Sequence, residues 1–575
     1  MTNLYHYQRL FLFCCFSLMS SNIPAIAQPT VPEFQPEKIF IQTDRQLYIT
    51  GEIIWFKLFV FDQLGDLSDF SKVAYVELID GAGTALTQLK IGLENGQGNG
   101  AIELPPGLGS GRYQLRAYTQ AMRNMGPEAF SYYSLILLHP EQPVVQAVSD
   151  QTGVELSGGR IGSSHNNDLK ITVRPGREQL GQREKVRMEI SSTDATGRPI
   201  AADISLAVAL TAPGQNEFAI GTTAPLQPPT DIIFRPENKS LLLQGKVSRQ
   251  SDGEAAHGQE IFLAFPGKTA RVYTVATDAN GHFSFLLPKM YGLQTVILQT
   301  GPEVSEPLRI ELEDEFHEII PTTPKAFTLP SAWLPVANAS LINTQVQQAY
   351  RAFEKPPVFN TEQTFSEVPF FGRPDVQYRL DDYNRFALPE FFYEIVLEVQ
   401  VRGKFGEQNI SLVNRENHVF EDYPPLLLVD GVPVFDQRTF LKINNRLIAS
   451  TEIVKNPFWL NPHFYNGIIQ LTSFEGDARV FELPETALRR TFLTLLPQRQ
   501  FTAPDHEARP DDSLPDFRNT LFWDPSIRTD EEGRANIEFF TSDALGNYTV
   551  EVLGVTETGL RGRVEQSIQV VKNSN

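Results

Sequence analysis

The chain has 575 residues, with 69 acidic residues, 49 basic residues and a formal net charge of −20 at neutral pH. Such an acidic chain is repelled by nucleic acid and by anionic lipid headgroups, so we expect no nucleic-acid partner. Only Cys14 and Cys15 carry thiols, and both lie near the N-terminus, so the rest of the chain has no disulfide, cysteine metal site or catalytic thiol. The length is that of about four domains.

The segment 1–27 has the order of a secretory signal peptide. Arg9 is its only charged residue, an apolar run follows at Leu10–Met19, and Ala25-Ile26-Ala27 matches the small-x-small pattern that precedes cleavage. We therefore expect a signal peptide over 1–27 and an exported chain, in the periplasm or associated with the outer membrane or cell surface. No later run has the ~18 apolar residues of a membrane-spanning helix, so we expect no transmembrane helix after signal cleavage.

Residues 36–140 are predicted to form a β-sandwich, and Trp55 lies in an apolar strand where we expect it to anchor the core. The strands of this sandwich are expected over 38–43, 53–57, 74–79 and 111–118. The segment Gln42–Phe56 resembles the second macroglobulin-like domain of the alpha-2-macroglobulin family, in which a TD-x-x-x-Y-x-x-GE loop leads into an aromatic-rich strand.

Three further β units are predicted. A second macroglobulin-like or immunoglobulin-like sandwich is expected over 151–225, and a C-terminal macroglobulin-like β unit over 517–572. Residues 240–312 resemble the small sandwich of carboxypeptidase regulatory-like domains. Because Asp bonds nearby backbone amides and Gly takes a positive φ, hairpin turns are predicted at the Thr-Asp-x-x-Gly sequences that begin at Thr193, Thr277 and Thr529.

Residues 333–386 are expected to form a connector that is helical in one part and irregular in the rest. The stretch 340–353 lacks Gly and Pro and fits helical spacing loosely, which favours a helix. The stretch 355–386 is rich in Pro and aromatic residues, so we expect it to be irregular.

Residues 387–478 resemble the plug domain of TonB-dependent outer-membrane transporters. The resemblance is carried by Leu426–Phe435, Ser450–Lys455 and Asn466–Ser473. About a hundred residues follow, too few for the barrel of about 22 strands that holds such a plug, so we expect a plug-like unit that acts without a pore. The predicted fold class is therefore mainly β: tandem immunoglobulin-like or macroglobulin-like sandwiches with a small α+β plug-like domain.

No catalytic motif stands out in the sequence. His317 precedes a Glu, but no second His follows at the spacing of a zinc helix. Pro266–Thr269 resembles the end of a phosphate loop, but position 262 is Phe rather than Gly, so a hairpin loop is the better interpretation. We therefore expect no catalytic residue, no cofactor, no metal site and no small-molecule substrate.

Aromatic side chains in and around the plug-like unit are candidates for docking a protein partner, because aromatic residues concentrate at interface anchors. The alternative is that these rings pack the connector and their own loops onto the unit. Pro457 and Pro462 restrict the backbone around two of the rings, which predicts a stiff loop. The candidate docking residues are Phe370, Phe371, Tyr378, Tyr383, Phe458 and Trp459.

Three functional hypotheses follow from these features. The leading one is a non-enzymatic accessory protein that binds within an outer-membrane or envelope protein complex for transport, secretion or assembly. The second is a macroglobulin-like protease inhibitor, which the family resemblance suggests, although the thioester of that family needs a cysteine. The third is a hydrolase whose carboxylates are brought together between domains.

Overall fold

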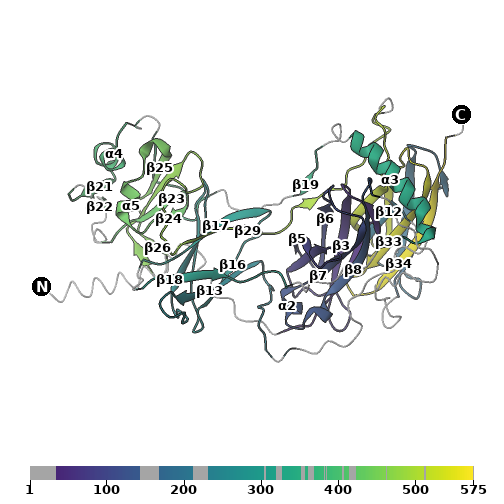
Figure 1. Ribbon diagram of the computed structural model, residues 1–575, viewed down its shortest axis with the longest axis horizontal. Coiled ribbons are helices and arrows are strands. Elements are labelled where there is room, and N and C mark those ends of the chain that lie inside the picture. The colour runs from purple at the N-terminus through teal and green to yellow at the C-terminus, as the bar shows by residue number, and fades with distance from the viewer. Residues whose placement is uncertain are drawn as a thin grey trace. The chain divides into compact units, whose positions relative to one another are not determined.

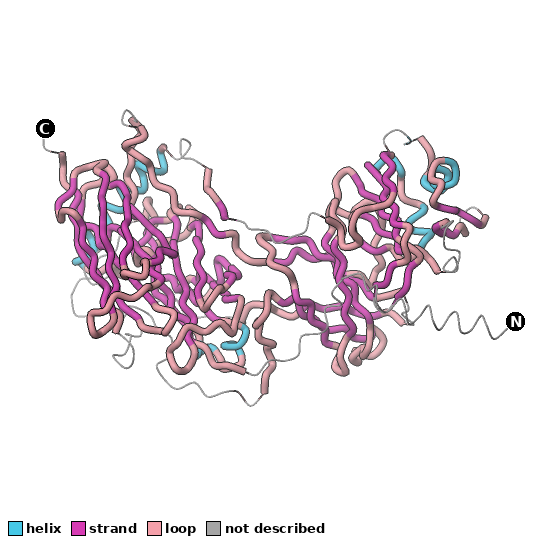
Figure 2. Tube along the Cα trace, turned by 180° about the vertical axis from the view of Figure 1, so that it is seen from behind, coloured by secondary structure: helices cyan, strands magenta, loops and turns pink. Residues whose placement is uncertain are grey.

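The computed structural model (Figure 1) has many strands and few helices, as the tube in Figure 2 shows, and the prediction of a mainly β chain is confirmed. The expected signal peptide, together with 151–167 and 212–225 of the expected second sandwich, lies outside the described residues. No helix in the described part is both long and apolar enough to cross a membrane. The structure describes residues 34–142, 168–211, 229, 231–302, 306–318, 327–350, 356–360, 368–380, 383, 385–404, 407–413, 423–460, 463–509 and 513–573.

Two compact units make up the described chain, and each is built from segments that are far apart in the sequence. We call the first the terminal unit, because it contains Val31–Leu241, Glu315–Gln363 and Leu495–Asn575. We call the second the central unit, which contains Leu242–Asp314 and Thr364–Thr494.

The terminal unit begins with a sandwich of a three-stranded and a five-stranded sheet. Strands β1 and β3 of the smaller sheet are buried along almost their whole length, and Phe40 and Phe59 on them pack on Leu553 and Val555 of the second sandwich. The smaller sheet has the order β1 (Lys38–Thr43), β3 (Ile53–Phe61) and β6 (Gln97–Glu103). The larger has the order β2 (Leu47–Ile49), β8 (Ser131–Leu138), β7 (Gly111–Tyr118), β4 (Val73–Ile79) and β5 (Ala85–Gly92), and α2 (Gln120–Arg123) and η1 (Pro127–Ala129) connect β7 to β8.

A second sandwich in the terminal unit joins the two segments that we expected to form separate units. Strands from 168–211 and strands from 520–570 lie together in both of its sheets, so the expected division into 151–225 and 517–572 is corrected to one discontinuous sandwich with one core. The five-stranded sheet is β10 (Gln179–Leu180), β34 (Arg561–Val570), β33 (Gly546–Val555), β12 (Asp203–Leu210) and β31 (Thr520–Arg528). The three-stranded sheet is β32 (Arg534–Phe540), β11 (Lys185–Thr193) and β9 (Lys170–Pro175).

Helix α3 (Leu334–Ala349) follows the short helix η2 (Ser331–Trp333) and begins earlier than the predicted 340–353. Pro335 lies in its first turn, where the missing N–H has no intrahelical partner to lose. Trp333 and Ala337 pack on Leu47 and Ile49 of β2, so the helix belongs to the terminal unit. Nearby, β19 (Phe359–Asn360) pairs with β30 (Gln498–Arg499).

The central unit contains a small sandwich and an α+β part. The sandwich has the sheet β16 (His282–Leu286), β13 (Leu242–Arg249) and β18 (Leu308–Leu312), and the sheet β15 (Arg271–Ala276), β14 (Glu260–Phe265), β17 (Leu293–Thr300) and β29 (Leu488–Leu493). The α+β part has the sheet β20 (Val376–Arg379), β25 (Ile448–Val454), β28 (Ile468–Ser473), β23 (Leu426–Val429) and β24 (Val432–Pro433). Around that sheet lie the hairpins β21 (Val399–Arg402) with β22 (Asn409–Leu412) and β26 (Phe458–Leu460) with β27 (His463–Tyr465), and the helices α4 (Leu388–Glu394), α5 (Gln437–Leu441) and η6 (Asn445–Leu447).

Two edge strands of the central unit were not expected. β29 comes from 488–493 and completes a sheet of the sandwich expected over 240–312. β20 comes from 376–379, inside the stretch predicted to be irregular, and it pairs with Ser450–Ile453 of β25. The prediction of irregular structure there is wrong, because a cross-strand partner so far along the chain leaves no local signal.

A tight turn at Asp430-Gly431 connects β23 to β24. Asp430 and Gly431 have φ values of 50° and 77°, as a tight hairpin turn of this kind requires. A side chain at Gly431 would come within 2.8 Å of the Cα atom of Ala270, so the close approach also requires glycine. The buried Asp430 carboxylate accepts hydrogen bonds from Ser473 and Ala478, which ties the turn to the end of β28.

Candidate docking surface

The macroglobulin-like signature forms a buried polar network around Asp44. One carboxylate oxygen accepts hydrogen bonds from the Tyr48 hydroxyl at 2.7 Å and the Trp55 backbone N–H at 3.0 Å. The other accepts from the Thr520 hydroxyl at 2.5 Å and the Arg45 Nε at 3.4 Å. Burial raises the pKa of the Asp44 carboxyl, and the Arg45 charge and the hydrogen bonds from Thr520 and Tyr48 oppose that rise.

Glu52, at the end of the same signature, links three parts of the terminal unit. Its carboxylate pairs with Arg45 Nη1 at 3.0 Å and accepts hydrogen bonds from Thr344 of α3 at 3.0 Å and from Asn519, just before β31, at 2.7 Å. The signature therefore holds the first sandwich, α3 and the second sandwich together. All the hydrogen bonds that Asp44 and Glu52 accept come from donors within the terminal unit, so these two carboxylates serve as structural links.

The hairpin β26–β27 presents an aromatic pair on its outer face. Side chains alternate in a strand, so Phe458 and Leu460 are buried, whereas Trp459 between them is 51% exposed. Trp459 is directly opposite Phe464 in the antiparallel register, and the two rings meet edge to face with their centroids 5.7 Å apart. Cross-strand ring pairs of this kind stabilise a hairpin and fix the direction of both side chains.

Tyr423 extends the pair to three rings. Its ring lies edge to face with Phe464 at a centroid distance of 4.9 Å, and 48% of Tyr423 is exposed. Pro424 and Pro425 follow it and restrict the backbone, and the Pro424 carbonyl accepts a hydrogen bond from the Asn466 N–H at 3.0 Å. We call Tyr423, Trp459 and Phe464 the aromatic patch.

The inner face of the hairpin is fixed to the central unit. Phe458 and Tyr465 belong to the core cluster that includes Phe262 of β14. The His463 ring nitrogen Nε2 lies 2.5 Å from a carboxylate oxygen of Glu260, on the same strand as Phe262. The aromatic patch is therefore held by a rigid support, which lowers the conformational entropy that a partner would have to remove on binding.

The other candidate docking residues are turned toward cores. Phe458 is only 7% exposed, so the interpretation of Phe458 as a docking ring is wrong. Phe370 and Phe371 are half-buried against the same cluster, and the Phe370 ring meets the Phe458 ring at 5.6 Å.

Tyr378 and Tyr383 are half-buried too, and both pack on Phe391 of α4, at ring distances of 6.3 Å and 5.8 Å. The Tyr378 hydroxyl donates a hydrogen bond to Glu398 at 2.8 Å, and burial together with that carboxylate raises the pKa of Tyr378 to about 12. These contacts favour the alternative that the connector rings pack onto the unit.

Two residues of the patch, Tyr423 and Phe464, are missing from the sequence-based candidates. A signal for Phe464 was present: a two-residue period places Trp459 and Phe464 on one face once Phe458–Leu460 and His463–Tyr465 are paired as a hairpin. Tyr423 had no such signal, because its contact with Phe464 depends on the parallel pairing of β23 with β28. In the described ranges, no three His, Cys, Asp or Glu side chains gather as a metal site would need.

Comparisons with known proteins match no family model and no curated protein. Among solved structures, trypsin-activated alpha-2-macroglobulin from Escherichia coli covers 94% of this chain with 42% of its own, at 9% identity and a TM-score of 0.25. Salmonella alpha-2-macroglobulin reacted with methylamine covers 95% of this chain with 40% of its own, at 11% identity and a TM-score of 0.24. Dimeric latent PorU from Porphyromonas gingivalis covers 48% of this chain with 33% of its own, at 10% identity and a TM-score of 0.16. This chain therefore spans less than half the length of the alpha-2-macroglobulins that it is similar to, at low identity and low TM-score.

Proposed function

We propose that this chain is an exported, non-enzymatic binding protein that docks onto a protein complex of the Gram-negative cell envelope. The observation that carries the proposal is the aromatic patch: Trp459 and Tyr423 are each about half exposed on a hairpin and a proline segment that are both anchored to the central unit. Exposed, rigidly held Trp and Tyr side chains are the groups most enriched among the residues that dominate binding energy at protein interfaces.

Two further features support the compartment and the mode of action. The signal-like order of residues 1–27 favours export, and residues 387–478 resemble a plug domain, which in its own family works inside an outer-membrane protein. The partner that this chemistry fits is a folded envelope protein with an apolar pocket able to receive an indole ring.

The test replaces Trp459 and Phe464 by Ser in the full chain. We expect the amount of envelope partner recovered by affinity capture from detergent-solubilised membranes to fall by about ten-fold or more, because loss of an interface anchor costs ~2 kcal/mol or more. The unfolding midpoint should fall only slightly, since Trp459 is half exposed and the lost cross-strand ring pair contributes ~0.2–1 kcal/mol.

Tyr393→Ser is the matched control, because Tyr393 is a 70% exposed ring of the same unit that lies outside the patch. It should leave capture unchanged. Equal recovery of the partner by the double variant and the unchanged chain, or an equal loss with Tyr393→Ser, would contradict docking through the patch.

A further inference from the structure

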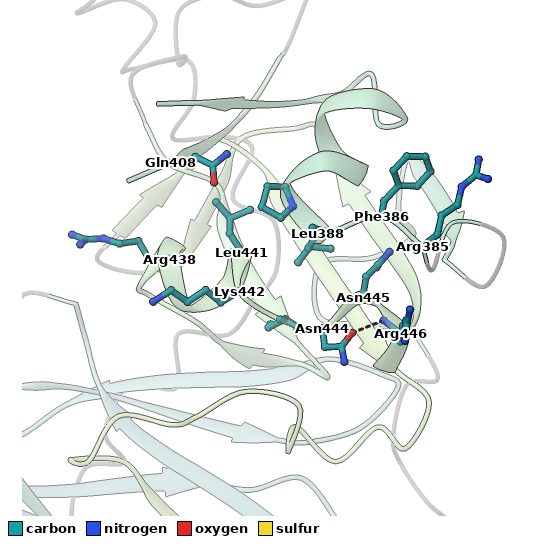
Figure 3. Close-up of a pocket in the computed structure, with 13 residues that line it drawn as sticks. Arg385, Phe386, Leu388, Gln408, Arg438, Leu441, Lys442, Asn444, Asn445 and Arg446 are labelled. Carbon is teal, nitrogen blue, oxygen red and sulfur yellow. Dashed lines mark hydrogen bonds between the residues drawn. The ribbon is translucent and has the colours of Figure 1, made fainter. Parts of the chain in front are cut away.

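A cavity of about 420 Å³ opens in the central unit between the start of α4 and the turn that follows α5 (Figure 3). Its volume falls in the range of pockets that hold small ligands. The cavity is lined by residues of three segments, 385–389, 438–446 and Gln408. None of them belongs to the aromatic patch, so the cavity is a separate site.

Cations dominate the charge of this cavity. Arg385, Arg438, Lys442 and Arg446 are all exposed around it, and no Asp or Glu is among the described residues that line it. Among the described residues, none of these four side chains forms an ion pair with a carboxylate, and Arg385 lies over the Phe386 ring at 5.1 Å from its centroid. Four cations without an acidic neighbour in the lining are unexpected in a chain with 69 acidic and 49 basic residues.

Three acidic residues of the described chain are close in sequence to the lining but are not part of it. Asp436 caps α5, where its carboxylate accepts hydrogen bonds from the N–H groups of Arg438 and Thr439. Glu390 and Glu407 are adjacent in sequence to lining residues but are not part of the lining. Asp436 also interacts electrostatically with Arg438, so Arg385, Lys442 and Arg446 supply most of the positive charge that the described lining offers to a ligand.

The floor of the cavity is apolar. Leu388, Leu441 and Ile443 are buried members of the core cluster of the α+β part, and each also lines the cavity. Asn445, which is buried too, donates a hydrogen bond from its side-chain amide to the Tyr383 carbonyl at 3.1 Å and so fixes one wall. A ligand that fits this cavity combines a negative charge for the rim with an apolar body for the floor.

We propose that the cavity binds a small amphipathic anion, with a phosphate or carboxylate head and an apolar chain or ring. The head lies among the rim cations, where charge-assisted hydrogen bonds form, and the apolar part covers Leu388 and Leu441. This binding activity goes beyond docking through the aromatic patch. No pattern in the sequence indicates it, because three separate segments form the lining.

Calorimetric titration of the full chain with octyl phosphate, below its micelle concentration, tests the proposal. The variant Arg438→Glu/Lys442→Glu should bind octyl phosphate about ten-fold or more weakly, because two attractive charges become repulsive. Lys268→Glu/Arg490→Glu, which reverses two exposed cations of the same unit outside the lining, should leave the affinity unchanged. Ala387→Trp keeps every charge and fills the mouth from an exposed position, and it should abolish binding.

Two ligand controls separate the charge from the apolar contact. Inorganic phosphate and octanol should each bind about ten-fold or more weakly than octyl phosphate, since each lacks one half of the ligand. Octanol that binds as tightly as octyl phosphate, or a charge-reversal or Ala387→Trp variant with unchanged affinity, would overturn the proposal. Co-sedimentation with phosphatidylglycerol vesicles that is lost in Arg438→Glu/Lys442→Glu would identify the natural ligand as a lipid. Binding of octyl phosphate without co-sedimentation would identify it as a soluble compound.

Discussion

Replacing Asp44 by Ala is expected to destabilise the terminal unit by about 3–5 kcal/mol, the cost of breaking a buried ion pair by removing one partner. The buried carboxylate accepts hydrogen bonds from four donors, which belong to β2, β3, β31 and Arg45. Without it the Tyr48 hydroxyl and the Thr520 hydroxyl lose their buried acceptor, and each such loss costs ~1–3 kcal/mol before relaxation. The measurement is the free energy of unfolding in urea, followed by tryptophan fluorescence.

Asp530→Ala is the control for the loss of Asp44. Asp530 also follows a Thr and also accepts a backbone hydrogen bond, from Arg534, but it is exposed in a hairpin turn. Its replacement should cost about 1 kcal/mol or less. Similar losses for both variants would mean that the network around Asp44 does not hold the sandwiches together.

Trp55→Ala is expected to cost about 3–5 kcal/mol, the loss typical of a large ring removed from a core. The sequence predicts Trp55 as the anchor of the first sandwich. The structure confirms that Trp55 is buried, at 7% exposure, but its ring lies at the junction with the second sandwich. Its cluster contains Ala207 and Trp523 of the second sandwich, and its ring meets Phe501 edge to face at 5.5 Å. The substitution should therefore loosen the junction of the two sandwiches.

Trp459→Ala is a matched control for Trp55→Ala, since it removes the same side chain from the surface. The free energy of unfolding should fall by about 1 kcal/mol or less, the contribution of its ring pair with Phe464. An unchanged free energy of unfolding after Trp55→Ala would show that the ring is not part of a core. It would contradict the packing of Trp55 at the junction of the two sandwiches.

Local signals in the sequence predict much of this fold. The strands expected over 38–43, 74–79 and 111–118 are present, and so are the three Thr-Asp-x-x-Gly turns, in which Gly197, Gly281 and Gly533 have positive φ. Side-chain alternation and turn residues act within a short stretch of chain, so both can be recognised in the sequence. Pairing between strands that are far apart in the sequence has no comparable local signal. β12 pairs with β31 and β33, which lie in the C-terminal part of the chain, and this pairing joins two segments that the sequence presents as separate units.

The candidate docking surface, too, could be predicted from the sequence only where its signals are local. The aromatic composition of Phe458–Leu460 and the stiffness of the prolines were evident in the sequence, but which ring faces water was not. Phe458 is buried because Phe262 of β14, from a distant part of the chain, completes its cluster, whereas no described element covers Trp459 to the same extent. The cavity near α4 needed three segments to be assembled before its charge could be recognised.

Site-specific photo-crosslinking in the cell envelope tests the docking claim most directly. The full chain would carry a benzophenone amino acid at position 459 in one version and at position 393 in another, since Trp459 and Tyr393 are exposed rings of the same unit. We expect light to give one discrete adduct with an envelope protein from position 459 and none from position 393. No adduct at position 459, or the same adducts from both positions, would contradict docking through the aromatic patch.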